Sequence, residues 1–284
     1  MVYTALAETR PDPAISELVR ILSSGINVVG SSFAWLVAPH YADDWLREPL
    51  ERACADGNTS LFINGIDPGF SGDTLVHTAL SLCGRARAIK VLEIFDYGDY
   101  DDAEYTGVHM GFGGDPNDPP LLMHPEILKS FFGGQVRSLA DNLGVKLDEL
   151  RAYGESWVTP DPIECVMMHV PAGRVGAIRF TIEGIRNDEP IISVGHINRL
   201  TAVSAPDWPY PPEGRPGVHH VTVTGDPDVV VNAHVGGAGV SAPVAGVIAT
   251  AARVVNMIEP VCTAPSGLLA AKDLPAAYFH GVMW

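Results

Sequence analysis

The sequence predicts an α/β protein whose first part is a parallel sheet and whose second part is α+β with an antiparallel sheet. The first observation is that residues 1–63 alternate short β-type runs with amphipathic helices. The second is that residues 166–224 contain several strand-like runs joined by turns. The third is a strongly apolar helical pattern at 243–258, which we expect to return to the first part. Strand–helix–strand units form right-handed parallel crossovers, whereas strands joined by short turns pair antiparallel.

Each element of the first part has its own signal. Asp12-Pro13 is typical of a helix start and Gly25 of a helix end, and Pro49 lies within the second helical pattern. We therefore expect strands at 1–6, 26–29 and 60–63 and helices at 12–24 and 41–55. This order is that of a partial Rossmann-type parallel sheet. No G-x-G-x-x-G fingerprint follows any of these strands.

The second part is interrupted at 96–122 by a loop rich in Asp, Gly, Tyr and Pro. Its other elements follow from hydrophobic periodicity and turn residues such as Arg186-Asn-Asp188. The expected helices are 73–82, 124–142 and 146–152, and the expected strands are 88–95, 166–174, 176–186, 190–203 and 219–224.

Charge and cysteine usage narrow the class of protein. The chain has 18 basic and 34 acidic residues, a net charge of −16, which argues against binding to nucleic acid or an anionic membrane. Its four cysteines lie far apart without metal-ligand spacing, as in reduced cytosolic proteins. Residues 1–25 show no signal-peptide pattern, and no apolar run approaches the ~20 residues of a membrane helix. We expect a cytoplasmic protein with no membrane or nucleic-acid partner.

Candidate ligand-binding residues follow the strands of the first part, because ligands of parallel α/β sheets bind at the carboxyl ends of strands. Gly65 and Gly69 allow a flat ring to approach the backbone closely, and Asp67-Pro68-Gly69 leads into a helix whose first N–H groups face the crevice. The alternative is that these segments are ordinary capped turns. The candidates are Thr4, Ala5, Ser31, Ser32, Asn64, Gly65, Pro68 and Gly69.

Three side chains are candidate catalytic proton donors. Asp67 is the acid nearest to a strand end, although it is equally a candidate helix cap. His169 and His196 lie in the expected antiparallel meander and are otherwise ordinary sheet residues. His219 and His220 are neighbours on a strand, so they point to opposite faces and cannot bind one metal together. We treat this pair as structural and expect no metal site.

Five stretches suggest a family when they are taken together. They are Val2-Tyr-Thr-Ala5, Gly25-Ile-Asn-Val-Val29, Asn64-Gly-Ile-Asp-Pro-Gly69, Ala205-Pro-Asp-Trp-Pro209 and Val255-Asn-Met-Ile-Glu-Pro260 with Ala264-Pro-Ser-Gly267. With these the chain resembles the dihydrodipicolinate-reductase-like proteins, which include 2,4-diaminopentanoate dehydrogenase and the native amine dehydrogenases. The resemblance implies an NAD- or NADP-dependent oxidoreductase that transfers a hydride to or from a small imine, amine or carbonyl substrate. It implies that Asn256 joins the cofactor contacts and that the chain forms homodimers or larger homo-oligomers.

The resemblance also implies three domains. They are the C-terminal half of a dinucleotide-binding domain at 1–75, an α+β substrate and oligomerisation domain at 76–240, and a helix and tail at 241–284 that pack back on the first domain. Family members begin with a Gly-rich strand–turn–helix that precedes the first matching stretch, so we expect this chain to be N-terminally truncated. Met1 is then either a misplaced start or a genuine truncation, and dinucleotide binding by the chain is in doubt.

Two departures from the family concern function. Amine dehydrogenases carry a glutamate close to the turn at Ser32, whereas residues 31–35 contain no carboxylate. The His-His and lysine pattern of true dihydrodipicolinate reductases is matched only at Ala264-Pro-Ser-Gly267, which disfavours lysine biosynthesis. The alternative to an oxidoreductase is a non-catalytic homologue that folds and associates without binding a dinucleotide.

Overall fold

A computed structural model describes residues 1–237 and 239–275. The chain divides into two compact units. Among the described residues, unit 1 comprises 1–74 and 248–275, and unit 2 comprises 75–237 and 239–247. The second division falls within the late apolar helix, a few residues after the expected boundary at 240/241.

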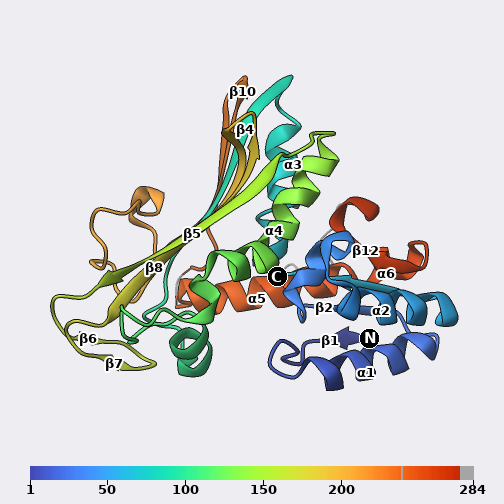
Figure 1. Ribbon diagram of the computed structural model, residues 1–284, viewed down its shortest axis with the longest axis horizontal. Helices are drawn as coiled ribbons and strands as arrows, with labels where there is room; N and C mark the ends of the chain where they lie inside the picture. Colours follow the sequence, from blue (N-terminus) through green and yellow to red (C-terminus); the bar gives the residue numbers. More distant parts are fainter. Residues whose placement is uncertain (238, 276–284) are drawn as a thin grey trace. The chain divides into compact units, whose positions relative to one another are not determined.

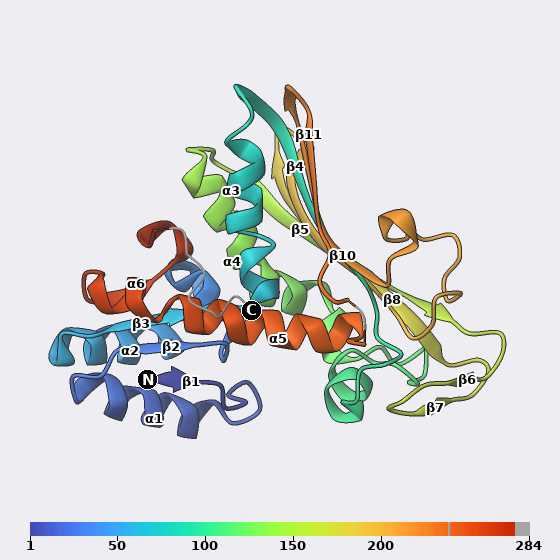
Figure 2. The same ribbon diagram turned by 180° about the vertical axis from the view of Figure 1, so that it is seen from behind.

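Unit 1 contains a parallel sheet, as the sequence predicted. Its described strands are β1 (Val2–Tyr3), β2 (Val28–Gly30), β3 (Ser60–Ile63) and β12 (Gly267–Leu269), in the spatial order β1-β2-β3-β12. Every neighbouring pair among them is parallel. Figures 1 and 2 show this part of the chain with the helices that follow β1 and β2. The last strand, β12, was not expected, because its three residues carry too short a pattern.

Helices cover both faces of this sheet. Helices α1 (Pro11–Ser23) and α2 (Asp44–Gly57) form one apolar layer with Leu61 and Ile63 of β3. The C-terminal part of α5 (Ala242–Asn256) and α6 (Ile258–Thr263) form the other layer with Phe62. Alternate residues of a strand point to opposite faces, so β3 supplies both layers. The predicted return of the late helix to the first part is therefore confirmed.

Unit 2 is built on a second, larger sheet. Its described strands are β4 (Arg85–Asp96), β5 (Glu149–Val158), β8 (Val175–Arg186), β9 (Glu189–Arg199), β10 (Gly217–Asp226) and β11 (Val229–Ala233), in the spatial order β11-β10-β4-β9-β8-β5. We expected an antiparallel sheet, but β4 and β9 are parallel neighbours. The long connection between them includes α4 (Pro125–Asn142), which lies against β5, β8 and β9. A connection of that length permits a parallel pair.

Several expected elements of unit 2 differ from the structure. The helix expected at 146–152 is wrong, because β5 pairs with β8 along its whole length from Glu149 to Val158. The strand expected at 166–174 shrinks to β7 (His169–Val170), which pairs with β6 (Ile163–Glu164). The loop at 96–122 contains two short helical turns and the buried side chains Met110 and Phe112. The remaining short helices are α3 (Thr74–Leu80), η1 (Ala34–Val37), η2 (Pro39–Tyr41), η3 (Ile66–Phe70), η4 (Glu104–His109), η5 (Leu121–Met123), η6 (Pro212–Gly214) and η7 (Ala271–Asp273).

The turn between β8 and β9 fixes the register of the centre of this sheet. Asn187 and Asp188 both have positive φ, at 54° and 63°, which is the backbone of the tight turn that matches strand twist. Asn and Asp tolerate this conformation better than most residues. The turn predicted at Arg186-Asn-Asp188 is confirmed, and it places Phe180 opposite His196.

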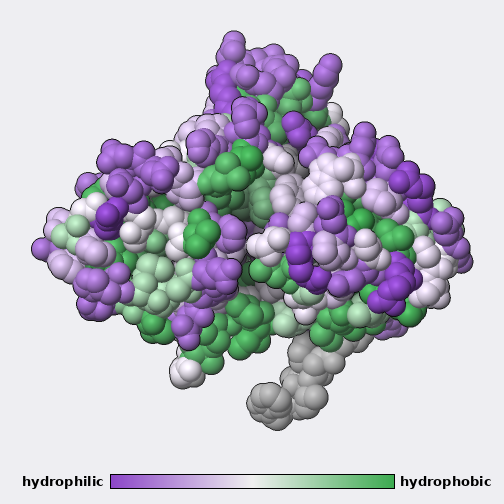
Figure 3. All heavy atoms as spheres, turned by 60° about the horizontal axis from the view of Figure 1, so that its bottom comes forward, coloured by the Kyte–Doolittle hydropathy of each residue, from purple (hydrophilic) through white to green (hydrophobic). Residues whose placement is uncertain are grey.

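The late apolar segment continues beyond α5 into α6. Among the described residues, the stretch Ala242–Thr263 is long and apolar enough, by length and composition, to cross a membrane: it has 22 residues, a mean hydropathy of 1.4 and a buried share of 22%. The expectation that no run approaches this length is therefore wrong. Val254, Met257 and Val261 from this stretch contribute to the core of unit 1. Figure 3 shows apolar residues at the surface in several separate patches among polar ones.

Candidate active site

The ends of three parallel strands in unit 1 lie side by side. Tyr3 is paired with Gly30, and Gly30 is paired with Ile63, so the residues that follow them share one edge of the sheet. The backbone N–H of Ser31 donates to the carbonyl of Tyr3 at 3.3 Å, and that of Asn64 donates to the carbonyl of Gly30 at 2.9 Å. The structure thus brings together the three turns that were singled out in the sequence.

The first two turns are held to each other by side chains. Ser32 is buried, and its hydroxyl donates to the carbonyl of Ala5. Thr4 is exposed at the same edge, and Ser31 is half-buried. The Ser32 hydroxyl is therefore committed to the protein backbone, whereas Thr4 lies open to solvent.

The third turn is anchored by a polar network that reaches α5. The Asn64 side chain donates to Asp73 at 2.9 Å and accepts from Nε of Arg253 at 3.1 Å. Arg253 also donates to Thr74 Oγ1 at 3.0 Å, and its guanidinium lies 3.7 Å from the Asp73 carboxylate. Thr250 accepts the N–H of Ile66 at 3.1 Å. Arg253 and Asp73 are mostly buried, so these bonds fix the turn rigidly.

The segment 65–69 has an unusual backbone. Gly69 has a φ of +142°, and a Cβ there would lie 2.7 Å from Oδ1 of Asn64. Asp67 accepts a hydrogen bond from the Ser71 hydroxyl at 2.8 Å and precedes the cis proline Pro68. Helix α3 begins only at Thr74, so the turn does not lead directly into a helix as expected.

Replacement of Gly69 by alanine is expected to destabilise unit 1. The methyl group would be pressed against Asn64 in a backbone region that side chains rarely adopt, so we expect a loss of about 2–4 kcal/mol in the free energy of unfolding. Urea unfolding measures it. Gly246→Ala is the control, because a Cβ at Gly246 meets no atom within 4 Å. Equal effects of the two substitutions would contradict the prediction.

A carboxylate does reach the turn at Ser32, although none is near it in sequence. The Glu8 side chain accepts the backbone N–H of Ala34 at 3.1 Å and that of Ala7 at 3.2 Å. Glu8 is half-buried and comes from the loop between β1 and α1. Residues 31–35 themselves contain no carboxylate, but the fold supplies one to this turn from 26 positions away.

The role of Glu8 in holding the two loops together is testable. Glu8→Ala removes both acceptors and is expected to lower the free energy of unfolding by about 1–3 kcal/mol. Glu8→Gln keeps one acceptor oxygen and should lose less. Thermal unfolding of both variants beside Asp12→Asn, a change at an exposed position of the following helix, measures the difference. An alanine variant as stable as the wild-type chain would show that the two bonds are dispensable.

Unit 2 contains a buried polar cluster of its own on the face of the sheet that α4 covers. Glu93 of β4 is paired with His196 of β9 and with His219 of β10. Nδ1 of His196 lies 3.3 Å from Oε1 of Glu93, and Nδ1 of His219 lies 4.0 Å from Oε2. Asn198 donates to Oε1 of Glu93 at 3.0 Å. All four residues are less than a tenth exposed.

The charge state of this cluster is set by its own members. Burial alone would raise the pKa of Glu93, but the charge and hydrogen bond of His196, with His219 and Asn198, outweigh it and lower the pKa to about 2. Glu93 is therefore a carboxylate at neutral pH. A buried carboxylate beside imidazole nitrogens is an arrangement that transfers protons in many enzymes.

Comparison with known proteins identifies the family. Residues 129–282 match the family model of the 2,4-diaminopentanoate dehydrogenase C-terminal domain. An amine dehydrogenase of Streptomyces virginiae is 34% identical over 276 residues, which cover 97% of this chain and 77% of that protein. The chain belongs to the family of 2,4-diaminopentanoate dehydrogenase and the amine dehydrogenases. The resemblance inferred from the five sequence stretches is confirmed.

A solved structure supports the fold of the dehydrogenase family in this chain. The amine dehydrogenase from Mycobacterium smegmatis has a TM-score of 0.70 and 16% sequence identity, over 99% of this chain and 76% of that one. At this identity the match concerns the fold alone. It agrees with the α/β class predicted from the sequence.

Two further residues predicted from the sequence are His169 and Asn256. His169 is exposed in β7 and pairs with Glu164 of β6, so the structure does not bring it to His196. Asn256 is the last residue of α5 and is half-buried. His219, which the sequence analysis treated as structural, lies beside Glu93. Glu93 was missed, yet its signal was present: a charged residue stands between the inward-facing Val91 and Phe95 of an alternating strand.

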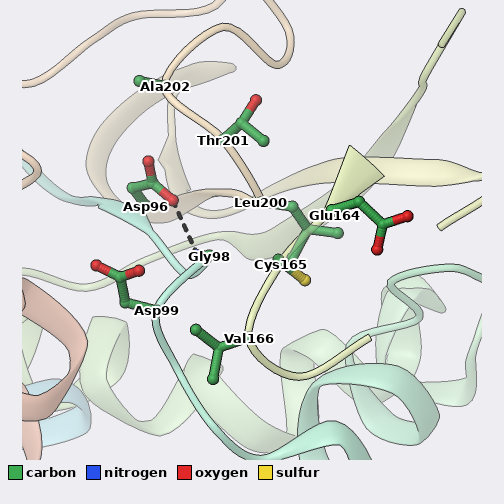
Figure 4. A pocket seen from close by; sticks show the side chains of 9 residues that line it. All are labelled: Asp96, Gly98, Asp99, Glu164, Cys165, Val166, Leu200, Thr201 and Ala202. Atoms are coloured by element: carbon green, nitrogen blue, oxygen red, sulfur yellow. Dashed lines mark hydrogen bonds between the residues drawn. The ribbon is translucent and has the colours of Figure 1, made fainter. Parts of the chain in front are cut away.

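Unit 2 also has an acidic cavity of about 520 Å³. Figure 4 shows the residues around it: Asp96 at the end of β4, Asp99 after that strand, Glu164 and Cys165 at β6, and Thr201 after β9. Burial, reinforced by the charge of Asp99, raises the pKa of Asp96. Asp96 and Glu93 are three residues apart on one strand, so they face opposite sides of the sheet. In this dehydrogenase-family chain the cavity is thus distinct from the Glu93 cluster.

Proposed function

We propose that the chain is an oxidoreductase that transfers a hydride between a nicotinamide dinucleotide, NAD or NADP, and the carbon of a carbon–nitrogen bond in a small amine or imine. The observation that carries the proposal is the family membership, since the matched family model and the Streptomyces relative are both named as dehydrogenases of amino compounds. The aligned strand ends of unit 1 add a physical reason, because parallel α/β sheets bind their ligands at such an edge.

The residues at this edge fit the nicotinamide end of a dinucleotide. Gly30 packs so closely that a Cβ would lie 2.2 Å from the carbonyl of Tyr3, and the exposed Thr4 leaves room for a flat ring beside the backbone. In this proposal the ring and its ribose contact Thr4, Ala5, Ser31, Ser32, Asn64, Gly65, Pro68, Gly69 and Asn256. The bound dinucleotide would accept or donate the hydride. The G-x-G-x-x-G phosphate fingerprint is not in the sequence, so binding must be measured directly.

The reaction defines what the chain has to supply. In amine oxidation the ammonium loses a proton, a hydride leaves the carbon with its electron pair, and an iminium forms that water converts to a carbonyl compound and ammonia. The chain must orient the C–H bond and accept the proton. The proposed proton-handling residues are Asp67, His169 and His196. His169 and His196 each have a carboxylate neighbour, Glu164 and Glu93, and only the His196 pair is buried.

Two measurements test the proposal. Fluorescence titration with NADH and with NADPH should show saturable binding of one or both. Incubation with the oxidised cofactor and a panel of small primary amines and diamino acids should then produce absorbance at the wavelength of the reduced nicotinamide. Simple alcohols serve as the control panel. Dinucleotide binding without turnover of any amine, or absence of binding, would contradict the proposed activity of this chain.

A homodimer or larger homo-oligomer in the cytoplasm completes the proposal. Its partner is then a second copy of the chain, with no role for nucleic acid or a membrane. The net charge of −16 is consistent with the latter expectation. Sedimentation velocity at several protein concentrations should give a species of twice the chain mass or more, and a monomer throughout would contradict it.

A further inference from the structure

The acidic cavity of unit 2 is enclosed by three segments that are far apart in the sequence. They are residues 96–99 at the end of β4, 164–166 at β6 and 200–202 after β9. The backbone N–H of Val166 donates to the carbonyl of Gly98 at 3.0 Å, and that of Tyr97 donates to the carbonyl of Arg199 at 2.6 Å. These bonds join all three segments, so the cavity belongs to the fold of unit 2. Its volume of about 520 Å³ is in the range of small-molecule sites.

The lining of the cavity combines three carboxylates with three apolar side chains. They are Asp96, Asp99 and Glu164, and Val166, Leu200 and Ala202. Figure 4 shows Asp96 and Asp99 on one side of the view and Glu164 on the other, with Leu200 and Cys165 between them. Among the described residues that line the cavity, none is a lysine or an arginine. The cavity thus offers negative charge at two places, separated by less polar surface.

The surroundings of Asp96 disfavour its negative charge. Asp96 accepts a hydrogen bond from the backbone N–H of Gly98 at 2.9 Å, yet burial, followed by the charge of Asp99, raises its pKa. A cation bound in the cavity would offset both effects, whereas an anion would add to the repulsion. On the other side, Glu164 is exposed and has His169 beside it. The electrostatics of the cavity therefore favour a cationic ligand.

The geometry of the lining indicates which kind of cation fits. A divalent metal ion needs oxygen ligands that converge on one point at about 2.0–2.6 Å. Among the described residues, these three carboxylates do not form a group whose oxygens all lie within 4.8 Å of one another. An aliphatic diamine fits better, because each ammonium group needs only one or two carboxylate neighbours and the methylene chain packs on apolar side chains. An amino acid would bring a carboxylate to a lining that has no basic residue.

We propose that the acidic cavity of unit 2 is a binding site for a short aliphatic diamine in its diammonium form. One ammonium group lies at Asp96 and Asp99, the other lies at Glu164, and the methylene chain lies against Leu200 and Val166. The inference concerns binding to unit 2 alone and requires no dinucleotide. It goes beyond the proposed oxidoreductase activity, and each of the two can fail without the other.

Isothermal titration calorimetry with 1,4-diaminobutane, without dinucleotide and at constant ionic strength, tests the proposal. Saturable binding at one site per chain is expected. Two compounds of the same length serve as controls: 1,4-butanediol has no charge, and 4-aminobutanoate carries a carboxylate, so both should bind at least about tenfold more weakly. Absence of diamine binding, or binding of MgCl₂ in place of the diamine, would overturn the proposal.

A pair of variants separates the cavity from the overall charge of the chain. Asp96→Asn removes one ammonium partner and is expected to weaken diamine binding by about tenfold or more. Asp118→Asn is the matched control, because it makes the same change of charge at an exposed residue outside the lining, and it should bind as the wild-type chain does. Equal weakening in both variants would show that the net charge of −16 attracts the diamine, and would overturn the proposal.

Two further measurements locate the diamine if Asp96→Asn folds poorly. Cys165 lines the cavity and is half-buried, so saturating 1,4-diaminobutane should slow its alkylation by iodoacetamide severalfold, as measured by mass spectrometry. The exposed Cys262 is the internal reference and should react at an unchanged rate. Ala202→Lys brings a permanent ammonium group to the exposed rim and should abolish diamine binding. Unprotected Cys165, or wild-type binding by Ala202→Lys, would place the diamine elsewhere and overturn the proposal.

Discussion

Replacement of Arg199 by methionine is expected to lower the free energy of unfolding by about 3–5 kcal/mol. Arg199 is 2% exposed at the end of β9. Its Nε donates to the carbonyl of Ser204 at 2.9 Å, and Nη2 donates to those of Trp208 and Pro209 at 3.0 and 2.8 Å. Its guanidinium also lies over the ring of Tyr210 at 4.2 Å. Methionine fills a similar volume but leaves these carbonyls without a donor, at about 1–3 kcal/mol for each that stays buried.

The effect depends on the shape of the guanidinium as well as on its charge. Arg199→Lys keeps the charge but cannot reach the same carbonyls with a planar fork, so an intermediate loss is expected. The control is Arg151→Met, since Arg151 on β5 is half exposed and pairs with Glu149 at the surface, where such pairs contribute at most about 1 kcal/mol. Urea unfolding at pH 7, followed by tryptophan fluorescence, measures all three. Equal losses for Arg199→Met and Arg151→Met would refute the role of Arg199 in holding the loop that follows β9.

Replacement of Glu93 by glutamine is expected to change how stability depends on pH. The pKa of Glu93 is lowered from 4.5 to about 2 in the folded chain. A lowered pKa means that the ionised carboxylate stabilises the fold above pH 4.5, and that this contribution is lost as the pH falls from about 4.5 to about 2. At about 1.4 kcal/mol per pKa unit, the contribution is on the order of 3 kcal/mol. The variant should therefore be less stable than the wild-type chain by that order at pH 7, and the difference should shrink towards pH 2.

Glu17 provides a contrast for this measurement. Hydrogen bonds from Arg10 and Tyr3 also lower the pKa of Glu17 to about 2, but this group lies at the surface in contact with solvent. The loss in Glu17→Gln should be smaller and should decrease further in 1 M NaCl, because salt weakens interactions between solvent-exposed charges. The loss in Glu93→Gln should persist in salt, because the pair is buried. A salt-sensitive Glu93 effect would indicate that the pair is open to water.

Local signals in the sequence were sufficient for the first three strands and two helices of unit 1, but not for β12. Asp12-Pro13, Gly25 and the β-type runs placed the helices and strands, and the rule for parallel sheets placed Thr4, Ser31 and Asn64 at one edge. The same reasoning failed for β5, because the run from Glu149 contains good helix formers and its strand conformation depends on pairing with β8. Strand propensity is decided largely by such neighbours. The parallel pairing of β4 with β9 was likewise invisible in the sequence.

Some features of the candidate site were likewise predictable from the sequence, and others were not. The sequence by itself determined the fold class, the family and the edge of unit 1, because hydrophobic periodicity, turn residues and short motifs are local properties of the chain. Only the tertiary structure decided which polar side chains meet: Arg253 with Asn64, which are 189 positions apart, Glu8 with the turn at Ala34, and Glu93 with His196. These contacts depend on strand register and helix packing, in which a shift of one residue would turn each side chain to the opposite face.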